Sequence, residues 1–159
     1  MHLAILFSVA VLLAAAAYND AQYYRIPNRI CVALILLFPA SLLTAPSDID
    51  WHQHLMIFIL VLVFGFIMFT QQIAGGGDIK LLAAISLWAG PHYIAVFIIT
   101  TALAGGLLAV LMVGLTRLRN RKRAKPLAIQ NVPIPYGVAI AAGGFIALYH
   151  LVQPILFPE

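Results

Sequence analysis

The chain has 159 residues, of which 64% are hydrophobic and only 9% are charged, and its formal net charge is +4. Soluble domains usually carry about 25% charged residues, so this composition excludes an ordinary soluble globular domain, and the long apolar runs indicate membrane spans. Cys31 is the single cysteine, which excludes an internal disulfide and a CxxC zinc site, and its apolar neighbours predict a small buried side chain.

The apolar segments predict an all-α, polytopic membrane protein of about six spans, with one domain over residues 1–159. The first segment, in "MHLAILFSVAVLLAAAAYND", lacks a basic n-region, so we expect a retained span rather than a signal peptide. A later segment, residues 79–90, would rise about 18 Å as a helix, well short of the ~30 Å hydrocarbon core. The other five are long enough to cross, or nearly so: residues 3–19, 29–45, 54–72, 92–116 and 136–156.

The distribution of positive charge indicates whether the short segment crosses. Of the nine Lys and Arg residues, six lie in "RLRNRKRAK" (117–125), and the others are Arg25, Arg29 and Lys80. Cytoplasmic loops concentrate Lys and Arg. If 117–125 is cytoplasmic and the segment 79–90 crosses, the other three positive residues fall on the same side; if it does not cross, they fall on the opposite side. We therefore expect six spans with both termini outside the cytoplasm.

A basic loop could also bind nucleic acid or anionic lipid. The loop at 117–125 is a small platform, so we interpret it as a topology determinant that contacts membrane lipid headgroups. We expect no nucleic-acid partner.

Two of the five acidic residues lie at the same expected membrane face. Asp48, Asp50 and Glu159 fall on the outer side or at the end of the chain. Asp20 comes at the cytoplasmic end of the first span and Asp78 at the cytoplasmic start of the short one. Taken singly, Asp20 could be a solvated loop acid and Asp78 a helix N-cap after a glycine turn. As a pair they suggest acid–base chemistry, because close carboxyls share a proton and can activate water as in aspartic proteases.

The sequence "AGGGDIK" (74–80) adds a reason to place Asp78 at a functional site. The short span lets its preceding loop dip into the bilayer, where irregular backbone needs cover from protein or water, and an ionisable group at that depth is a functional candidate. Helix ends suggest a division of roles: Asp78, at a helix N-terminus, starts as the base, and Asp20, at a helix C-terminus, starts as the acid.

Three motifs resemble those of type IV prepilin peptidases. Residues 75–80, "GGGDIK", match the GxGD signature, with a lysine two positions after the aspartate. "NDAQYYRIPNRI" (19–30) is similar to the first aspartate motif of that family, and "VPIPYG" (132–137) to the Pro-aromatic-Gly motif that opens its last span. The six-span pattern extends the resemblance over the whole chain.

The resemblance implies a membrane-embedded aspartic endopeptidase with Asp20 and Asp78 as its catalytic pair and Gly75 and Gly77 as signature glycines. Its substrates would be prepilins or pseudopilins, which carry a short basic leader before a hydrophobic helix and are cleaved at the junction. The implied location is the bacterial inner membrane, with the active site at the cytoplasmic face and possible pilus-assembly partners. Further residues match motif positions without an assigned chemical step: Lys80, Arg25, Pro27, Asn28, Pro135, Tyr136 and Gly137.

The chain departs from the larger members of that family. Those contain a cytosolic region with two CxxC pairs linked to N-methylation, whereas Cys31 is the single cysteine here and the loop between the first two spans is short. We expect a peptidase without methyltransferase activity, similar to the short enzymes of Flp (Tad) pilus systems. No cofactor or metal is implied, since His52 and His54, two positions apart, are weak candidates for a metal site.

Two other classes stay open on the sequence. Paired intramembrane acids also occur in proton relays, so a small proton-coupled transporter is one alternative. A non-catalytic pilus-assembly membrane subunit is the other, and it would tolerate Asp-to-Asn changes without loss of substrate processing.

Overall fold

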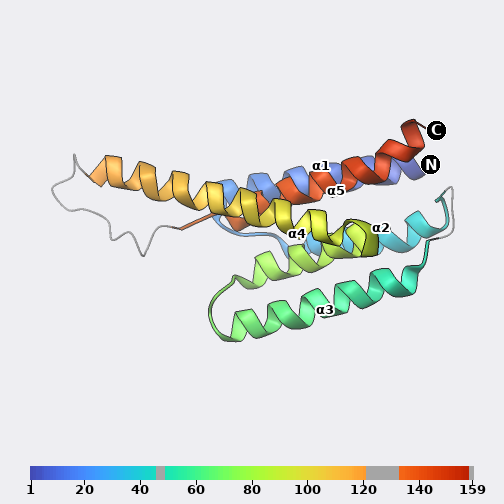
Figure 1. Ribbon diagram of the computed structural model, residues 1–159, viewed down its shortest axis with the longest axis horizontal. Helices are drawn as coiled ribbons and strands as arrows, with labels where there is room; N and C mark the ends of the chain where they lie inside the picture. The colour runs from blue at the N-terminus through green and yellow to red at the C-terminus, as the bar shows by residue number, and fades with distance from the viewer. Residues whose placement is uncertain (46–48, 121–132, 158–159) are drawn as a thin grey trace.

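The computed structural model of the protein describes residues 1–45, 49–120 and 133–157. These residues form a bundle of helices without strands, in agreement with the expected all-α membrane architecture (Figure 1). Four helices are long and apolar enough to cross a membrane, and a shorter apolar helix accompanies them. The helices are α1 (His2–Tyr23), α2 (Asn28–Leu42), α3 (Trp51–Thr70), α4 (Gly76–Asn120) and α5 (Tyr136–Leu156).

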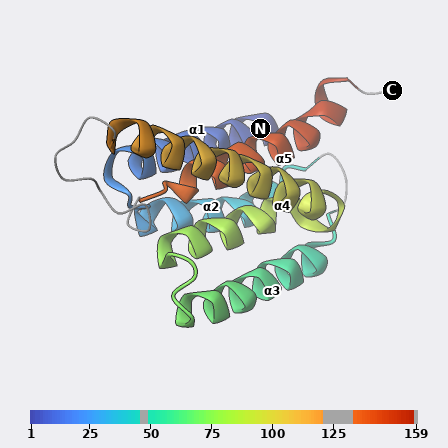
Figure 2. The same cartoon turned by 60° about the vertical axis from the view of Figure 1, so that its left-hand side comes forward.

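Helix α4 is two helical segments joined at a sharp reversal. Gly90 has φ +58° and ψ −170°, and Pro91 follows it. Only glycine adopts such a backbone readily, and proline suits the first position of a new helix because it has no amide hydrogen to leave unpaired. The segment 76–89 therefore runs one way and 91–120 returns antiparallel to it, as Figures 1 and 2 show. Divided here, the described helices give the six segments that the apolar pattern predicts.

The turn at Gly90 is closed by a side chain from α3. The Nδ1 atom of His54 lies 2.7 Å from the Leu87 carbonyl oxygen, and the His54 ring packs on Phe38 with centroids 5.4 Å apart. A Cβ atom at Gly90 would overlap the His54 ring. We expect Gly90→Ala to destabilise the protein by about 1–3 kcal/mol, because it combines a strained backbone with a steric overlap. Thermal unfolding in detergent, followed by circular dichroism, measures the loss.

Gly114→Ala is the matched control for Gly90→Ala. A Cβ atom at Gly114 would meet nothing within 4 Å, and the residue is in the helical part of the same element. Its melting temperature should equal or exceed that of the wild type, since alanine favours helix over glycine. Equal melting temperatures for the two variants would contradict the role assigned to the Gly90 turn.

Helix α5 packs in the centre of the bundle, against α1 and α4, by means of small residues. A Cβ atom at Gly143 would collide with Thr101 of α4, and one at Gly144 would lie 3.0 Å from Leu13 of α1. Small residues allow such close approach of helices in membranes. The surrounding core includes Val9, Leu34, Leu81, Ile85 and Phe97, all nearly inaccessible, and Cys31 is buried as expected.

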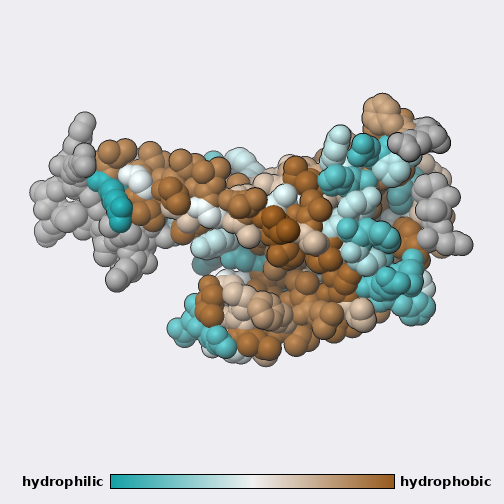
Figure 3. Space-filling model, in the orientation of Figure 1, coloured by the Kyte–Doolittle hydropathy of each residue, from teal (hydrophilic) through white to brown (hydrophobic). Residues whose placement is uncertain are grey.

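Helix α3 lies at the edge of the bundle beside α4. Gly65 is its one buried residue, and it packs against Ile79 of α4. The rest of α3 exposes large apolar side chains, and Figure 3 shows hydrophobic surface along both helices. This surface suits contact with lipid.

One end of the bundle collects the segments that carry the motifs. Here α1 ends, α2 begins, the first segment of α4 begins and α5 begins, while the N- and C-terminal labels lie at the other end (Figure 1). The start of α1 and the end of α5 thus share an end, as six spans require. Of the basic stretch, residues 121–125 lie outside the described residues, as does Val132 of the last motif.

Candidate active site

Asp20 lies in the last turns of α1 and is only 4% exposed. Its Oδ2 atom accepts a hydrogen bond of 2.6 Å from the backbone amide of Gly137, which lies 117 positions later in the chain. Helix α1 ends at Tyr23, and the next residue, Tyr24, takes a left-handed conformation (φ 52°) and donates its amide to the Asp20 carbonyl at 2.9 Å. Asp20 is thus fixed at both its backbone and its side chain.

The Asp20 carboxylate caps α5 from another helix. The N-cap residue of α5 is Pro135, whose side chain has no hydrogen-bonding atom, so an amide of the first turn needs an acceptor from elsewhere. Asp20 supplies it, and the positive end of the α5 dipole faces its carboxylate. Asp20 therefore lies beside the N-terminal end of α5 as well as the C-terminal end of its own helix, and the assignment of Asp78 as the base and Asp20 as the acid stays a prediction.

Asp78 lies in the first turn of α4, as expected. Its carboxylate turns back over the glycine run. The Oδ2 atom lies so close to Gly75 that a Cβ atom at that position would be only 2.7 Å away. Any side chain at Gly75 would push this carboxylate away. Gly77 is less confined, since a Cβ atom there would make ordinary contacts of 3.5 Å and more with Ile26.

Ile26 joins the three motifs, and the sequence analysis did not single it out. Its side chain lies against Gly77 at the start of α4, and its Cδ1 atom would be 2.8 Å from a Cβ atom at Gly137 at the start of α5. It thus packs between two helix starts that come from distant parts of the chain. Its position between Arg25 and Pro27 of the first motif was the available sequence signal.

The two aspartates line one cavity of about 340 Å3. The cavity is bounded by residues of the α1–α2 connection, the glycine run and the segment before α5. Among the described residues, the one ion pair lies at the opposite end of the bundle, between His52 and Asp50, and none joins Asp20 or Asp78 to an Arg or Lys. The lining residues are Asp20, Tyr24, Arg25, Ile26, Asn28, Gly75, Gly76, Gly77, Asp78 and Ile134.

The remaining motif residues surround this cavity. The Nζ atom of Lys80 donates a hydrogen bond of 3.0 Å to the Asn28 side chain, linking the starts of α4 and α2. Pro27 is the N-cap residue of α2, in agreement with the helix start expected there. Pro135 is buried and Tyr136 is half exposed, at the point where α5 begins. The three motifs therefore meet at one place.

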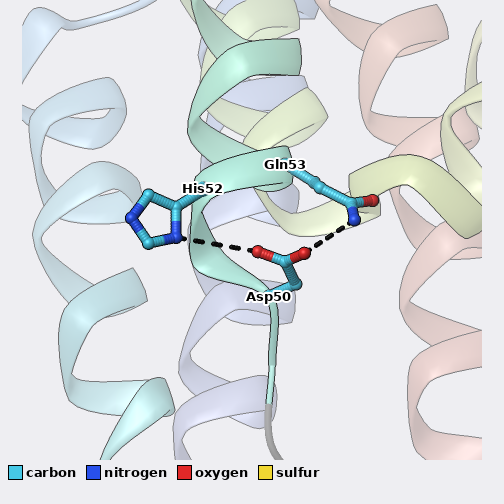
Figure 4. Close-up of polar contacts among 3 residues, drawn as sticks. All are labelled: Asp50, His52 and Gln53. Carbon is cyan, nitrogen blue, oxygen red and sulfur yellow. Dashed lines mark hydrogen bonds and ion pairs between the residues drawn. The ribbon is translucent and has the colours of Figure 1, made fainter.

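The two histidines at the start of α3, His52 and His54, do not form a shared site. His52 and Gln53 both approach Asp50, at 3.7 Å and 2.6 Å, at the exposed start of α3 (Figure 4). His54 points the other way, to the carbonyl of Leu87. Within residues 1–45, 49–120 and 133–157, no three His, Cys, Asp or Glu side chains gather as metal ligands would.

Comparison with known proteins shows that the chain is similar to one family of peptidases. A model of the type IV leader peptidase family matches residues 7–110. The chain is 32% identical over 142 residues to a "Prepilin leader peptidase/N-methyltransferase" of Bacillus subtilis (strain 168), which covers 86% of this chain and 51% of that protein. Proteins of the same description from Pseudomonas aeruginosa and Aeromonas salmonicida are 39% and 38% identical over 74 residues, 46% of this chain and 22% of each relative.

The chain thus spans about half the length of the Bacillus subtilis protein that it matches. No solved structure matches it. The family match includes Asp20, the connection after α1 and the glycine run with Asp78.

Proposed function

Because this chain belongs to the type IV leader peptidase family, we propose that it is a membrane aspartic endopeptidase that removes the basic leader from prepilins or pseudopilins. The observation that carries the proposal is the meeting of Asp20 and Asp78, from two different helices, in one cavity at one end of a membrane bundle. Among the described residues, neither acid forms an ion pair with a basic side chain.

The proposed reaction uses the two carboxyls as a base and an acid. The ionised carboxylate accepts a proton from water while the water oxygen bonds to the carbonyl carbon of the scissile peptide. The protonated partner donates its proton to the carbonyl oxygen. The resulting diol then collapses, the peptide C–N bond breaks and the leaving nitrogen takes up a proton. Glu or Lys side chains are not needed for any step.

Positive charge supports a cytoplasmic position for the acid cavity. Arg25, Arg29 and Lys80 lie at the end of the bundle that holds the cavity, and α4 carries Arg117 towards the same end. Lys and Arg concentrate on the cytoplasmic side of membrane proteins. We therefore propose an inner-membrane protein whose active site faces the cytoplasm. The start of α1 and the end of α5 would then lie on the opposite side of the membrane, outside the cytoplasm.

The connection between α1 and α2 supports a short form of the enzyme. It consists of residues 24–27, which leaves no room at this point for an inserted cytosolic region with paired CxxC motifs. We propose peptidase activity without N-methylation, with Flp-type prepilins as the first substrates to test. Other pilus-assembly proteins are further candidates as partners.

Co-expression with a Flp-type prepilin tests the proposal. The prepilin alone should keep its full length on a gel, and co-expression with the wild-type protein should shorten it by the leader. Mass spectrometry of the product identifies the cleaved bond. An unshortened prepilin, with the protein present in the membrane, would contradict the proposed function.

A further inference from the structure

A second, larger hollow opens on the lipid-facing side of the bundle. It has a volume of about 680 Å3 and is bounded by α3, by both segments of α4 and by the start of α5. We call it the apolar groove. Its lining is almost wholly apolar, and Asp78 is the one charged residue in it.

The wall that α3 contributes is a single face of the helix. Leu60, Val61, Phe64, Gly65 and Met68 line the groove, spaced so that they stack on one side. From Leu60 to Met68 the helix rises about 12 Å, or about two turns. The groove is therefore long enough to receive about two turns of another helix laid along α3.

The apolar groove is continuous with the acid cavity. Gly75 and Asp78 line both. On the opposite wall stands Tyr136, whose neighbour Gly137 holds the Asp20 carboxylate. A peptide that passes from one hollow into the other must cross the Asp78 carboxylate.

We propose that the apolar groove binds the apolar helix of the substrate just beyond the scissile bond, while the leader lies in the acid cavity. This inference rests on the proposed peptidase function. Within the hydrocarbon core a peptide must satisfy its own backbone hydrogen bonds, so its segment in the groove is helical. The polarity of the two hollows agrees: the acid cavity holds the charged side chains Asp20, Asp78 and Arg25, whereas the groove beyond Asp78 has no charged side chain and suits an apolar helix.

The groove makes its α3 wall a determinant of specificity. Leu60 marks the end of that wall farthest along α3 from the acids, so it contacts the substrate helix some turns after the cut. Its neighbour Ile59 is exposed on α3 and lines neither hollow. The two residues are a matched pair. They are adjacent in sequence and both exposed, but Leu60 lines the groove and Ile59 does not.

Disulfide crosslinking between enzyme and substrate tests the groove. Leu60→Cys and Ile59→Cys are compared, with the native Cys31 buried and common to both. The Flp-type prepilin carries a single cysteine, moved one position at a time along the first turns of its apolar helix. With Leu60→Cys we expect a reductant-sensitive adduct at prepilin positions that are three to four residues apart, which lie on one face of the substrate helix. With Ile59→Cys we expect little adduct at any position.

A tryptophan pair gives a second readout that does not depend on disulfide formation. Leu60→Trp should fill the groove and lower kcat/KM for the prepilin by about tenfold or more, whereas Ile59→Trp should leave it unchanged. Two results together would overturn the proposal that the groove binds the substrate helix. The first is equal adduct yields at the two positions, or no adduct at either. The second is equal cleavage by the two tryptophan variants. That outcome would favour a lipid chain as the occupant.

Leader removal by the unsubstituted protein distinguishes failure of the groove proposal from failure of the peptidase proposal. If that protein removes the leader and the Leu60 variants behave like the Ile59 variants, the groove is wrong and the peptidase stands. If it does not remove the leader, the peptidase is wrong. A Leu60-specific adduct would then still support the groove as a site for an apolar helix, since crosslinking needs no cleavage.

Discussion

Asp20→Asn and Asp78→Asn are each expected to reduce leader removal by at least about 10²–10⁴-fold, because each deletes one partner of the proton transfer. Asparagine keeps the size of the side chain and a carbonyl oxygen. At position 20 that oxygen can still accept the hydrogen bond from the Gly137 amide, so α5 keeps its cap. The substitution therefore separates the chemistry from the packing. Rates of leader removal, read from gels at matched membrane levels of protein, measure the effect.

Asp50→Asn is the control for the two variants. Asp50 lies at the start of α3, at the other end of the bundle, where it contacts His52 and Gln53. This variant should cleave at the wild-type rate. Cleavage by Asp20→Asn or Asp78→Asn at the rate of Asp50→Asn would rule out the paired acids and make proton transport or assembly the leading function.

Gly137→Ala is expected to lower the rate about 100-fold, although it adds one methyl group and no charge. That methyl carbon would lie 2.8 Å from Asp20 Oδ2 and 2.8 Å from Ile26 Cδ1, so both side chains must shift. Asp20 is already confined by burial and cannot move without losing its amide donor. The loss should appear in kcat, because the substrate groove lies mainly on other residues.

Gly106→Ala is the matched control for Gly137→Ala. Both glycines are helical, but a Cβ atom at Gly106 would meet nothing within 4 Å. Its activity should be that of the wild type. If Gly137→Ala cleaves as fast as Gly106→Ala, the amide of Gly137 does not position Asp20.

The sequence could predict where the acids meet but not how they are held. Segment lengths and the distribution of Lys and Arg brought Asp20 and Asp78 to one end of the bundle, and the structure agrees. The boundary between the predicted segments 79–90 and 92–116 also agrees with the structure, which reverses the chain at Gly90 and Pro91. These features depend on local chemistry and on the thickness of the membrane.

Contacts between helices were beyond the reach of the sequence. In a soluble helix the apolar stripe reveals the buried face, but α3 is apolar on every side and buries only Gly65. The same limit hid the contact of Ile26 with the two glycines and the hydrogen bond from Lys80 to Asn28, which are 52 positions apart. The sequence repeats Gly-Gly at 105–106 and at 143–144, and it does not distinguish them: Gly143 and Gly144 pack closely, whereas Gly106 faces open space.

The dependence of Asp20 on α5 sets an order in time. During synthesis α1 leaves the ribosome first, and Gly137 follows Asp20 by 117 residues. At about 5–20 residues per second, Asp20 waits about 6–23 seconds for its amide donor. A nascent chain that has inserted its first helices already carries both acids, yet one of them lacks its partner. The acid cavity is thus complete only when α5 has joined the bundle, so the proposed peptidase activity would begin only once this last described helix is in place.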